Sequence, residues 1–248
     1  MSSGAAIVLI PTRAKQRIAS ECRRRRLVPA RSILGTEMPT FRQAIASEVP
    51  AIARLLSRAF ADDPIERWCL ACRGFRAVLE LEFLEVAGQI APEGWLWVAD
   101  ALHGVAAWIP PDASYDDSAV DAVVNPVLTE YGGDPRRVTT FWAWVESHRP
   151  DVPHWYLDFI AVDPDNRGSG CGGLLLRSGL ARVDGRTESV FLVTGNPRTV
   201  PWYERFGFRT LRSEDAPDDG PRVWFMIRSA SDGRLPILGA GSASWSGT

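Results

Sequence analysis

The stretch VDPDNRGSGCGGLLL, from Val162 to Leu176, decides how the fold is interpreted. It joins an apolar segment, His154–Val162, to leucines at helical spacing that continue to Val183. Glycines between a strand and a helix let backbone amides approach a phosphate closely, and the helix N-terminus adds partial positive charge. The stretch therefore predicts an anion-binding turn between a strand and a helix.

One ligand that suits such a turn is a dinucleotide. Gly168, Gly170 and Gly173 satisfy the fingerprint G-x-G-x-x-G. A dinucleotide turn follows its strand almost at once, usually in the first βαβ unit, with an acidic residue about 20 positions further on. Here the residues DPDNR separate the strand from the first glycine, and Glu188 precedes a strand instead of ending one. This context disfavours a nicotinamide or flavin site.

Elsewhere the chain alternates strand and helix patterns, which is typical of an α/β domain. Ser47 is a candidate N-cap for a helix that ends near ADDP, because a proline disfavours a helical residue before it. Residues 112–150 are expected to be mostly helical. Further helices are expected at Arg73–Val86 and Thr199–Arg205, and strands at Thr40–Ala44, Gly94–Asp100, Gly104–Pro111, His154–Val162, Ser189–Val193, near Thr210 and at Val223–Arg228.

A second motif gives the glycine turn a different interpretation. RGSGCG (Arg167–Gly172) fits R/Q-x-x-G-x-G/A, NPRTVPWYERFGF (Asn196–Phe208) begins about 30 residues later, and AFADDP stands at Ala59–Pro64. Together these motifs resemble the GCN5-related N-acetyltransferase (GNAT) superfamily, closest in pattern to the puromycin N-acetyltransferases over most of residues 40–228. The resemblance implies an α/β GNAT fold: a mixed central β-sheet flanked by helices, with antiparallel N-terminal strands and a splayed strand pair binding acetyl-CoA.

The resemblance also implies where acetyl-CoA binds as co-substrate. In the family the strand before the glycine turn presents its backbone to the pantetheine arm and acetyl carbonyl, and the loop amides hold the pyrophosphate. The matching positions in this chain are Ile160, Ala161, Val162, Arg167, Gly168, Ser169, Gly170, Cys171, Gly172, Gly173 and Asn196.

Two side chains are candidates for catalysis. Tyr203 matches the family tyrosine that faces the thioester sulfur and acts as general acid. Asp158 is a candidate general base, because a lone aspartate in an apolar strand needs a reason to be there. Strand alternation would place it on one face with Tyr156, Ile160 and Val162. A structural role as an acceptor for an arginine stays open.

Two other positions bear on the acceptor amine. His154 is a further candidate base, although at a strand start it is more often solvated or capping. Val193 stands where the puromycin-type enzymes have a glutamate, which puts identical substrate handling in doubt. An α-amino acceptor, with a pKa of roughly 7.7 to 8.0, would need little help from a base.

Charge divides the chain unevenly. Residues 1–37 carry a net charge of +6 and the remainder −8, and Lys15 is the only lysine. We expect a basic, disordered leader over 1–37, with Met38 as a plausible domain start, a GNAT domain over 38–230 and a flexible tail over 231–248. The run RRRR (Arg23–Arg26) would suit nucleic acid, and the composition also resembles an organellar transit peptide. An acidic body favours cationic amines over anionic substrates, and a role of the charge in ordinary solubility stays equally open.

The expected partners are acetyl-CoA and a small amine, with no nucleic acid and no membrane, in a monomer or homodimer. No apolar run approaches the ~18 to 20 residues that span a bilayer, and we expect a cytoplasmic protein. The four cysteines (Cys22, Cys69, Cys72 and Cys171) and three histidines lack a metal-ligand spacing, so no metal is expected.

The function expected from the sequence is transfer of the acetyl group of acetyl-CoA to a primary amine of a small molecule. The transfer would be direct, in a ternary complex. An aminonucleoside or another antibiotic is one such acceptor, which would make the enzyme a resistance factor. Two alternatives remain: acetylation of a protein or peptide amine, and a non-catalytic acyl-CoA-binding sensor.

Overall fold

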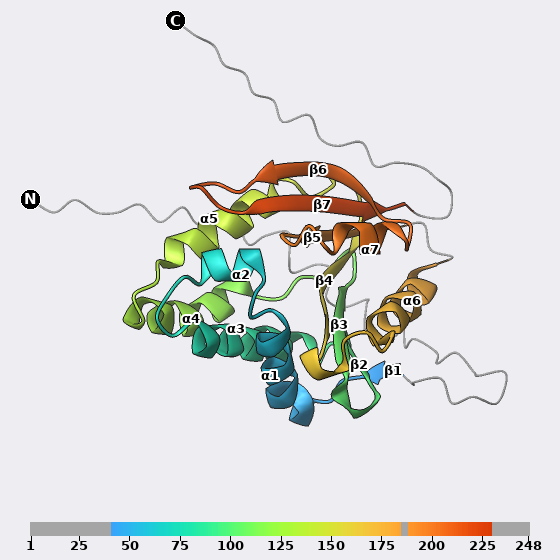
Figure 1. The fold of residues 1–248 in the computed structure, drawn as a ribbon, viewed down its shortest axis with the longest axis horizontal. Helices are drawn as coiled ribbons and strands as arrows, with labels where there is room; N and C mark the ends of the chain where they lie inside the picture. The colour runs from blue at the N-terminus through green and yellow to red at the C-terminus, as the bar shows by residue number, and fades with distance from the viewer. Residues whose placement is uncertain (1–40, 185–187, 230–248) are drawn as a thin grey trace, which may run out of the picture. The chain divides into compact units, whose positions relative to one another are not determined.

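The structure, a computed structural model, describes residues 41–184 and 188–229. Its strands form one sheet in the order β1-β2-β3-β4-β5-β7-β6, in which only the pair β4–β5 is parallel (Figure 1). The expected leader over 1–37 and tail over 231–248 lie outside the described residues. The strands are β1 (Phe41–Gln43), β2 (Leu96–Ala99), β3 (Gly104–Ile109), β4 (His154–Val162), β5 (Ser189–Thr194), β6 (Arg209–Asp215) and β7 (Arg222–Arg228).

Helices cover both faces of this sheet. The helices are α1 (Val49–Ala59), α2 (Pro64–Cys69), α3 (Phe75–Ile90), α4 (Asp117–Glu130), α5 (Pro135–Glu146), α6 (Cys171–Val183) and α7 (Val200–Glu204). One apolar core lies between the sheet and the helices α1 to α5, and a second lies under α6 and α7. Figure 1 shows α6 on the opposite side of the central strands from α1, α3 and α4. This mixed, mostly antiparallel sheet flanked by helices is the expected GNAT fold.

Two of the helix starts depend on proline and aspartate. Ser47 was expected to cap the first helix, and this is wrong: it lies inside a 3-10 turn, Ala46–Glu48, and α1 begins after it with a proline in its first turn. The side chain of Asp63 caps α2, because its Oδ1 accepts hydrogen bonds from the amides of Ile65 (2.9 Å) and Glu66 (3.4 Å). This cap fixes the direction in which α2 leaves the ADDP turn.

Helix α6 lies against the sheet at one glycine. A Cβ added to Gly179 would stand 2.1 Å from Cζ2 and 2.2 Å from Cε2 of Trp108, a buried residue of β3. Real Cβ atoms do not approach other heavy atoms so closely, so Gly179 is what lets α6 pack directly on the Trp108 ring. This contact sets how near the glycine turn lies to the sheet.

Among the described residues, no helix has both the length and the apolar character required to span a membrane.

Replacing Gly179 with alanine should therefore destabilise the fold by about 1–3 kcal/mol, because α6 must shift away from Trp108. Urea unfolding of the two proteins measures the change. Gly88→Ala is the matched control: it lies inside α3 and an added Cβ meets nothing within 4 Å, so it should be neutral or stabilising. Equal stabilities for the two variants would contradict the packing argument.

Candidate active site

The sheet opens between β4 and β5. The two strands pair only where His154–Tyr156 face Ser189–Phe191. Beyond that point β4 continues along β3 to Val162, while β5 continues along β7 to Thr194. The strands therefore part, and the backbone of β4 at Ile160–Val162 has no strand beside it on the β5 side. Such an edge offers amide and carbonyl groups to an extended ligand.

The glycine turn closes one end of this opening. Gly168 and Gly170 have φ values of +80° and +84°, and Gly170 is the N-cap residue of α6. A Cβ added to either glycine would meet nothing within 4 Å. Left-handed backbone explains the choice of glycine, and the free space leaves room for an anion at the helix N-terminus. The Oγ of Ser169 accepts a hydrogen bond from the Cys171 amide (3.3 Å) and holds the turn.

The first turn of α6 fits between β4 and α7. A Cβ on Gly172 would lie 3.3 Å from Cγ2 of Val162 and 3.6 Å from Cζ2 of Trp202. Gly173 lies beside the guanidinium of Arg177, which stands 5.6 Å from the centre of the Phe206 ring. Arg177 is thus a cation beside the turn that the motif comparison missed. Its signal in the sequence is its position one helical turn after Gly173.

Two of the predicted cofactor residues use their side chains to hold loops. The Nη2 of Arg167 donates a hydrogen bond to the carbonyl of Ala59 at the end of α1 (3.2 Å). The Oδ1 of Asn196 accepts a hydrogen bond from the Arg198 amide (3.0 Å) in the turn before α7. Contact of either residue with acetyl-CoA stays a prediction, and in both cases the side-chain bond orders the loop.

A β-bulge places Asp158 at the mouth of the opening. Trp108 of β3 faces Leu157 and Ala107 faces Phe159, so Asp158 is the extra residue of β4. The bulge reverses the alternation that the sequence suggested. Tyr156, Phe159 and Ala161 pack into the core under α1 to α5, whereas Leu157 and Ile160 pack on the α6 side. The expectation that Tyr156, Asp158, Ile160 and Val162 share one face is therefore wrong.

Asp158 faces the helices α2, α3 and α4 together with other acids. Burial raises the pKa of its carboxyl from 3.8 to about 7; the charge of Arg149 and a hydrogen bond with Tyr115 act in the opposite direction. Burial also raises the pKa of Glu82 on α3 to about 7, with Asp121 and Asp158 adding to the effect. The pKa of Glu66 on α2 is raised well above its usual value, first by burial and then by Glu82, Asp63 and Asp158.

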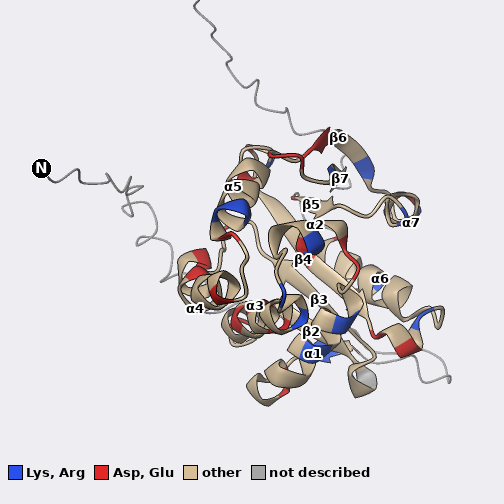
Figure 2. Ribbon diagram, turned by 60° about the vertical axis from the view of Figure 1, so that its left-hand side comes forward, with Lys and Arg blue, Asp and Glu red and all other residues tan. Residues whose placement is uncertain are grey.

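These acids define what we call the acceptor-side carboxylates: Glu66, Glu82 and Asp158. They come from three separate elements, and acidic positions recur along α2, α3 and α4 in the charge-coloured ribbon (Figure 2). The sequence predicted Asp158 alone. Glu66 and Glu82 lie within helices that carry several other charged residues, so nothing in the local pattern separates them from surface glutamates.

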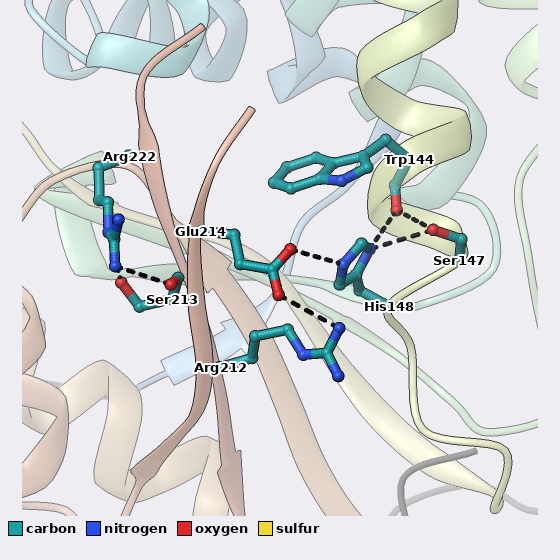
Figure 3. A network of polar contacts seen from close by, with 7 residues as sticks. All are labelled: Trp144, Ser147, His148, Arg212, Ser213, Glu214 and Arg222. Atoms are coloured by element: carbon teal, nitrogen blue, oxygen red, sulfur yellow. Dashed lines mark hydrogen bonds and ion pairs between the residues drawn. The ribbon is translucent and has the colours of Figure 1, made fainter. Parts of the chain in front are cut away.

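A network at the end of α5 positions the cation that faces Asp158. The ring of His148 stacks on Phe225 (4.7 Å between centroids), and its Nε2 lies 3.3 Å from Oε2 of Glu214 on β6 (Figure 3). The next residue is Arg149, whose guanidinium lies 4.2 Å from the centre of the Tyr156 ring. Because α5 is fastened to β6 and β7 here, Arg149 is held beside β4, where it favours the ionised form of Asp158.

Tyr203 lies on the other side of the opening. It is a residue of α7, it is 8 % exposed, and its ring packs against Trp202 and Phe208. Burial, helped by the charge of Asp63, raises the pKa of its hydroxyl well above the ordinary value. The turn that contains Asp63 lies close to the loop before α7. Gly195 of this loop has no side chain, and a Cβ added there would lie 2.7 Å from Cγ1 of Ile65. The hydroxyl therefore stays protonated at neutral pH.

The remaining candidates are His154, Val193 and the cysteines, of which Cys171 begins α6 at the glycine turn. His154 is the first residue of β4, where the two strands still pair, and its Nδ1 lies 2.8 Å from the Val152 carbonyl oxygen. Val193 is half-buried and packs against the apolar core. Cys69, Cys72 and Cys171 are free thiols. In the described part of the chain, no three His, Cys, Asp or Glu side chains are grouped so that they could hold a metal ion.

Comparisons with known proteins agree with this architecture. Residues 133–210 match the model of the Acetyltransferase (GNAT) domain family. A crystal structure from Corynebacterium glutamicum ATCC 13032, described as histone acetyltransferase HPA2 and related acetyltransferase, superposes with a TM-score of 0.58. It is 29% identical in sequence, and the alignment covers 81% of this chain and 99% of that one.

Two more distant structures share the fold alone. Arylalkylamine N-acetyltransferase 2 from Aedes aegypti is 14% identical over 77% of this chain and 98% of that chain, with a TM-score of 0.53. The C-terminal condensation domain of Ebony, in complex with beta-alanyl-dopamine, is 9% identical over 78% of this chain and 100% of that chain, with a TM-score of 0.55.

The fold, the opening and the matched domain define an acyltransferase. More particularly, residues 133–210 match the GNAT acetyltransferase domain, a family whose members use acetyl-CoA as co-substrate.

The raised carboxyl pKa values predict how stability depends on pH. In the unfolded chain these groups lose their protons near about pH 4, whereas Glu82 and Asp158 in the folded protein keep theirs until about pH 7. Their contribution to stability is therefore complete below about pH 4 and is lost as the pH rises through 7. The urea concentration at the midpoint of unfolding should therefore decrease when the pH is raised from 5.5 to 8.

Glu82→Gln should reduce that fall, because glutamine carries no charge at either pH. Glu80→Gln is the control on the same helix: Glu80 is two residues earlier, which points its side chain toward a different face. A fall of the same size in Glu82→Gln and in the unmodified protein would contradict the assignment of a raised pKa to Glu82.

Proposed function

We propose that the protein transfers the acetyl group of acetyl-CoA directly to a primary amine of a small molecule within a ternary complex. The observation that carries this proposal is the opening between β4 and β5, with Asp158 at its mouth and Tyr203 on α7 beyond it. A base on β4 and an acid on α7, the helix that follows β5, can serve the two ends of one transfer reaction.

The cofactor side of the site fits a pyrophosphate-bearing thioester. The open space above Gly168 and Gly170, the N-terminus of α6 and the guanidinium of Arg177 would hold the phosphates. The free edge of β4 at Ile160–Val162 would bind the amides of the pantetheine arm and polarise the acetyl carbonyl. Acetyl-CoA, when bound, supplies an activated acyl group with a thiol as leaving group.

On the acceptor side, Asp158 would accept a proton from the incoming amine. An alkyl ammonium has a pKa of about 10.4, so an ordinary aspartate would be a weak base toward it. Burial raises the Asp158 pKa to about 7, which reduces the mismatch by about 3 units while leaving the carboxylate ionised at mildly basic pH. As the new C–N bond forms and the C–S bond breaks, the amine proton passes to Asp158.

Tyr203 would donate a proton to the departing sulfur. Its hydroxyl is protonated at neutral pH because burial raises its pKa. The apolar surroundings formed by Trp202 and Phe208 would raise the pKa of a thiol in the same place, which keeps donor and acceptor matched. An ammonium acceptor first loses one proton to solvent; from the neutral amine onward, one proton moves from nitrogen to sulfur, and exchange with solvent restores both side chains.

Two particular classes of acceptor amine are compatible with this chemistry. The motif stretches of the puromycin-type enzymes favour an aminonucleoside or a related antibiotic, and Val193 departs from that pattern. A peptide or protein amine is the second candidate, because the Corynebacterium glutamicum protein is described as a histone acetyltransferase. Thiol release from acetyl-CoA, measured with small amines, puromycin and a lysine-containing peptide, distinguishes these acceptors.

Calorimetric titration with acetyl-CoA tests whether the protein binds the proposed co-substrate. We expect binding, and absence of binding would refute the proposed function. Binding without turnover on any amine would favour an acyl-CoA sensor.

Replacing Tyr203 with phenylalanine should lower kcat by at least about 10²-fold, the usual loss when a general acid is removed. Binding of acetyl-CoA should persist, because the ring stays in place. Tyr131→Phe is the matched control, since Tyr131 is 39% exposed and loses the same atom. Unchanged turnover in Tyr203→Phe would remove the tyrosine from the mechanism.

Replacing Asp158 with asparagine tests the base through the pH profile. In the unmodified enzyme kcat/KM should rise with pH through about 7, as the carboxyl loses its proton. Asp158→Asn should be slower by about 10²-fold or more and should lose that rise. The exposed Asp151, just before β4, supplies the control Asp151→Asn. An unchanged pH profile in Asp158→Asn would assign Asp158 a structural role.

A further inference from the structure

One carboxylate near Asp158 has an oxygen without a hydrogen-bond partner in the described part of the chain. The Oε2 atom of Glu82 is fully buried, and among the described residues none forms a hydrogen bond with it. The charged groups that act on Glu82 are the acids Asp121 and Asp158, and Glu82 in turn acts on Glu66. A buried carboxylate oxygen among other acids costs free energy unless it holds a proton or meets a cation.

Three neighbouring acids, Asp158, Asp63 and Asp121, differ from Glu82 in this respect. Asp158 has Arg149 and the Tyr115 hydroxyl, Asp63 accepts two amides at the start of α2, and Asp121 has a hydrogen bond with Asn125. Each of these carboxylates has a partner that favours its charged form. Glu82 and Glu66 therefore stand out: the charged groups that act on them in the described part of the chain are acids, and the Oε2 of Glu82 also lacks a hydrogen-bond partner there.

The arrangement suits an extended organic cation better than a metal ion. The acceptor-side carboxylates come from α2, α3 and β4 and interact through space, yet in the described part of the chain no three such groups converge as ligands of one ion. A flexible chain with positive charge at both ends could meet two of them at once. Tyr115, whose pKa is raised by burial and by the charge of Asp158, adds an aromatic ring that suits alkyl ammonium groups.

We propose that the acceptor is a diamine, whose reacting nitrogen faces Asp158 while its second ammonium is held by Glu82 with Glu66 nearby. This inference rests on the proposed function for the role of Asp158. The unpaired Oε2 of Glu82 is the atom that would accept a hydrogen bond from the distal ammonium. A charged pair of this kind selects for a substrate with two positive ends over one with a single amine.

Two probes of equal chain length test the inference: putrescine, which has two amines, and butylamine, which has one. We expect kcat/KM to favour putrescine by at least about tenfold in the unmodified enzyme. Glu82→Gln should reduce this preference by about tenfold, since glutamine keeps the shape but not the charge. The control Glu80→Gln should keep the preference. An equal kcat/KM for both probes, or an unchanged preference in Glu82→Gln, would overturn the inference.

Binding separates a failure of this inference from a failure of the proposed function. Calorimetric titration of the enzyme saturated with coenzyme A should show tighter binding of putrescine than of butylamine, and Glu82→Gln should remove the difference. Selective binding of putrescine without acetylation would keep the diamine site and refute the transfer reaction. Acetylation of butylamine and putrescine with equal binding would keep the transfer reaction and refute the diamine site.

Discussion

The constraint on which the site depends is that β4 has a neighbouring strand on both sides for only part of its length. Backbone amides and carbonyls inside a protein need partners, and β4 obtains them from β5 only at His154–Tyr156. Beyond Tyr156 the free edge needs another partner, and an extended ligand with amide groups can supply it. Near the same point the bulge turns Asp158 out of the regular alternation. One departure from a regular sheet thus produces both the free edge of β4 and the unusual position of Asp158.

Contacts between residues distant in sequence hold the glycine turn and the bulged part of β4 in place. Arg58 at the end of α1 pairs with Asp163 (3.0 Å) and Asp165 (2.7 Å) in the turn that follows β4, and Arg167 reaches the Ala59 carbonyl. On the other face, Gly179 lets α6 pack on Trp108, the β3 residue next to the bulge. The glycine turn is therefore held from α1 and from β3, so its amides are ordered before any ligand arrives.

The sequence predicted the fold well because its signals are local. The glycine turn, the YERFGF motif and the apolar strand are each contiguous, and the expected strands and helices occur in the structure with shifted ends. Predictions failed where a single backbone event decides the outcome. Ser47 looked like a cap, but the chain makes a 3-10 turn there. Strict alternation in β4 assigned Ile160 to the wrong face, because an inserted residue is invisible to a period of two.

The site itself could be predicted only in part, because its acids come together through tertiary structure. Asp158 was noticeable as a lone charge within an apolar strand. Glu66 and Glu82 were not, since a glutamate on a helix is usually solvated and the positions are distant in sequence. Arg149 could be linked to Asp158 only once the His148 network had placed the end of α5 beside β4.

Charge is divided across the opening in a way that the net charge of the chain does not reveal. The proposed cofactor side has the N-terminus of α6 and Arg177, whereas the proposed acceptor side has Glu66, Glu82 and Asp158. Such a division favours a polyanionic cofactor on one side and an amine on the other, and it disfavours either in the wrong place. Electrostatic interactions weaken with distance and with exposure to solvent. For a ligand in the opening, these few groups therefore matter more than the excess of acidic residues spread over the surface. The sequence inference that an acidic body attracts amines therefore applies to this cluster more than to the surface as a whole.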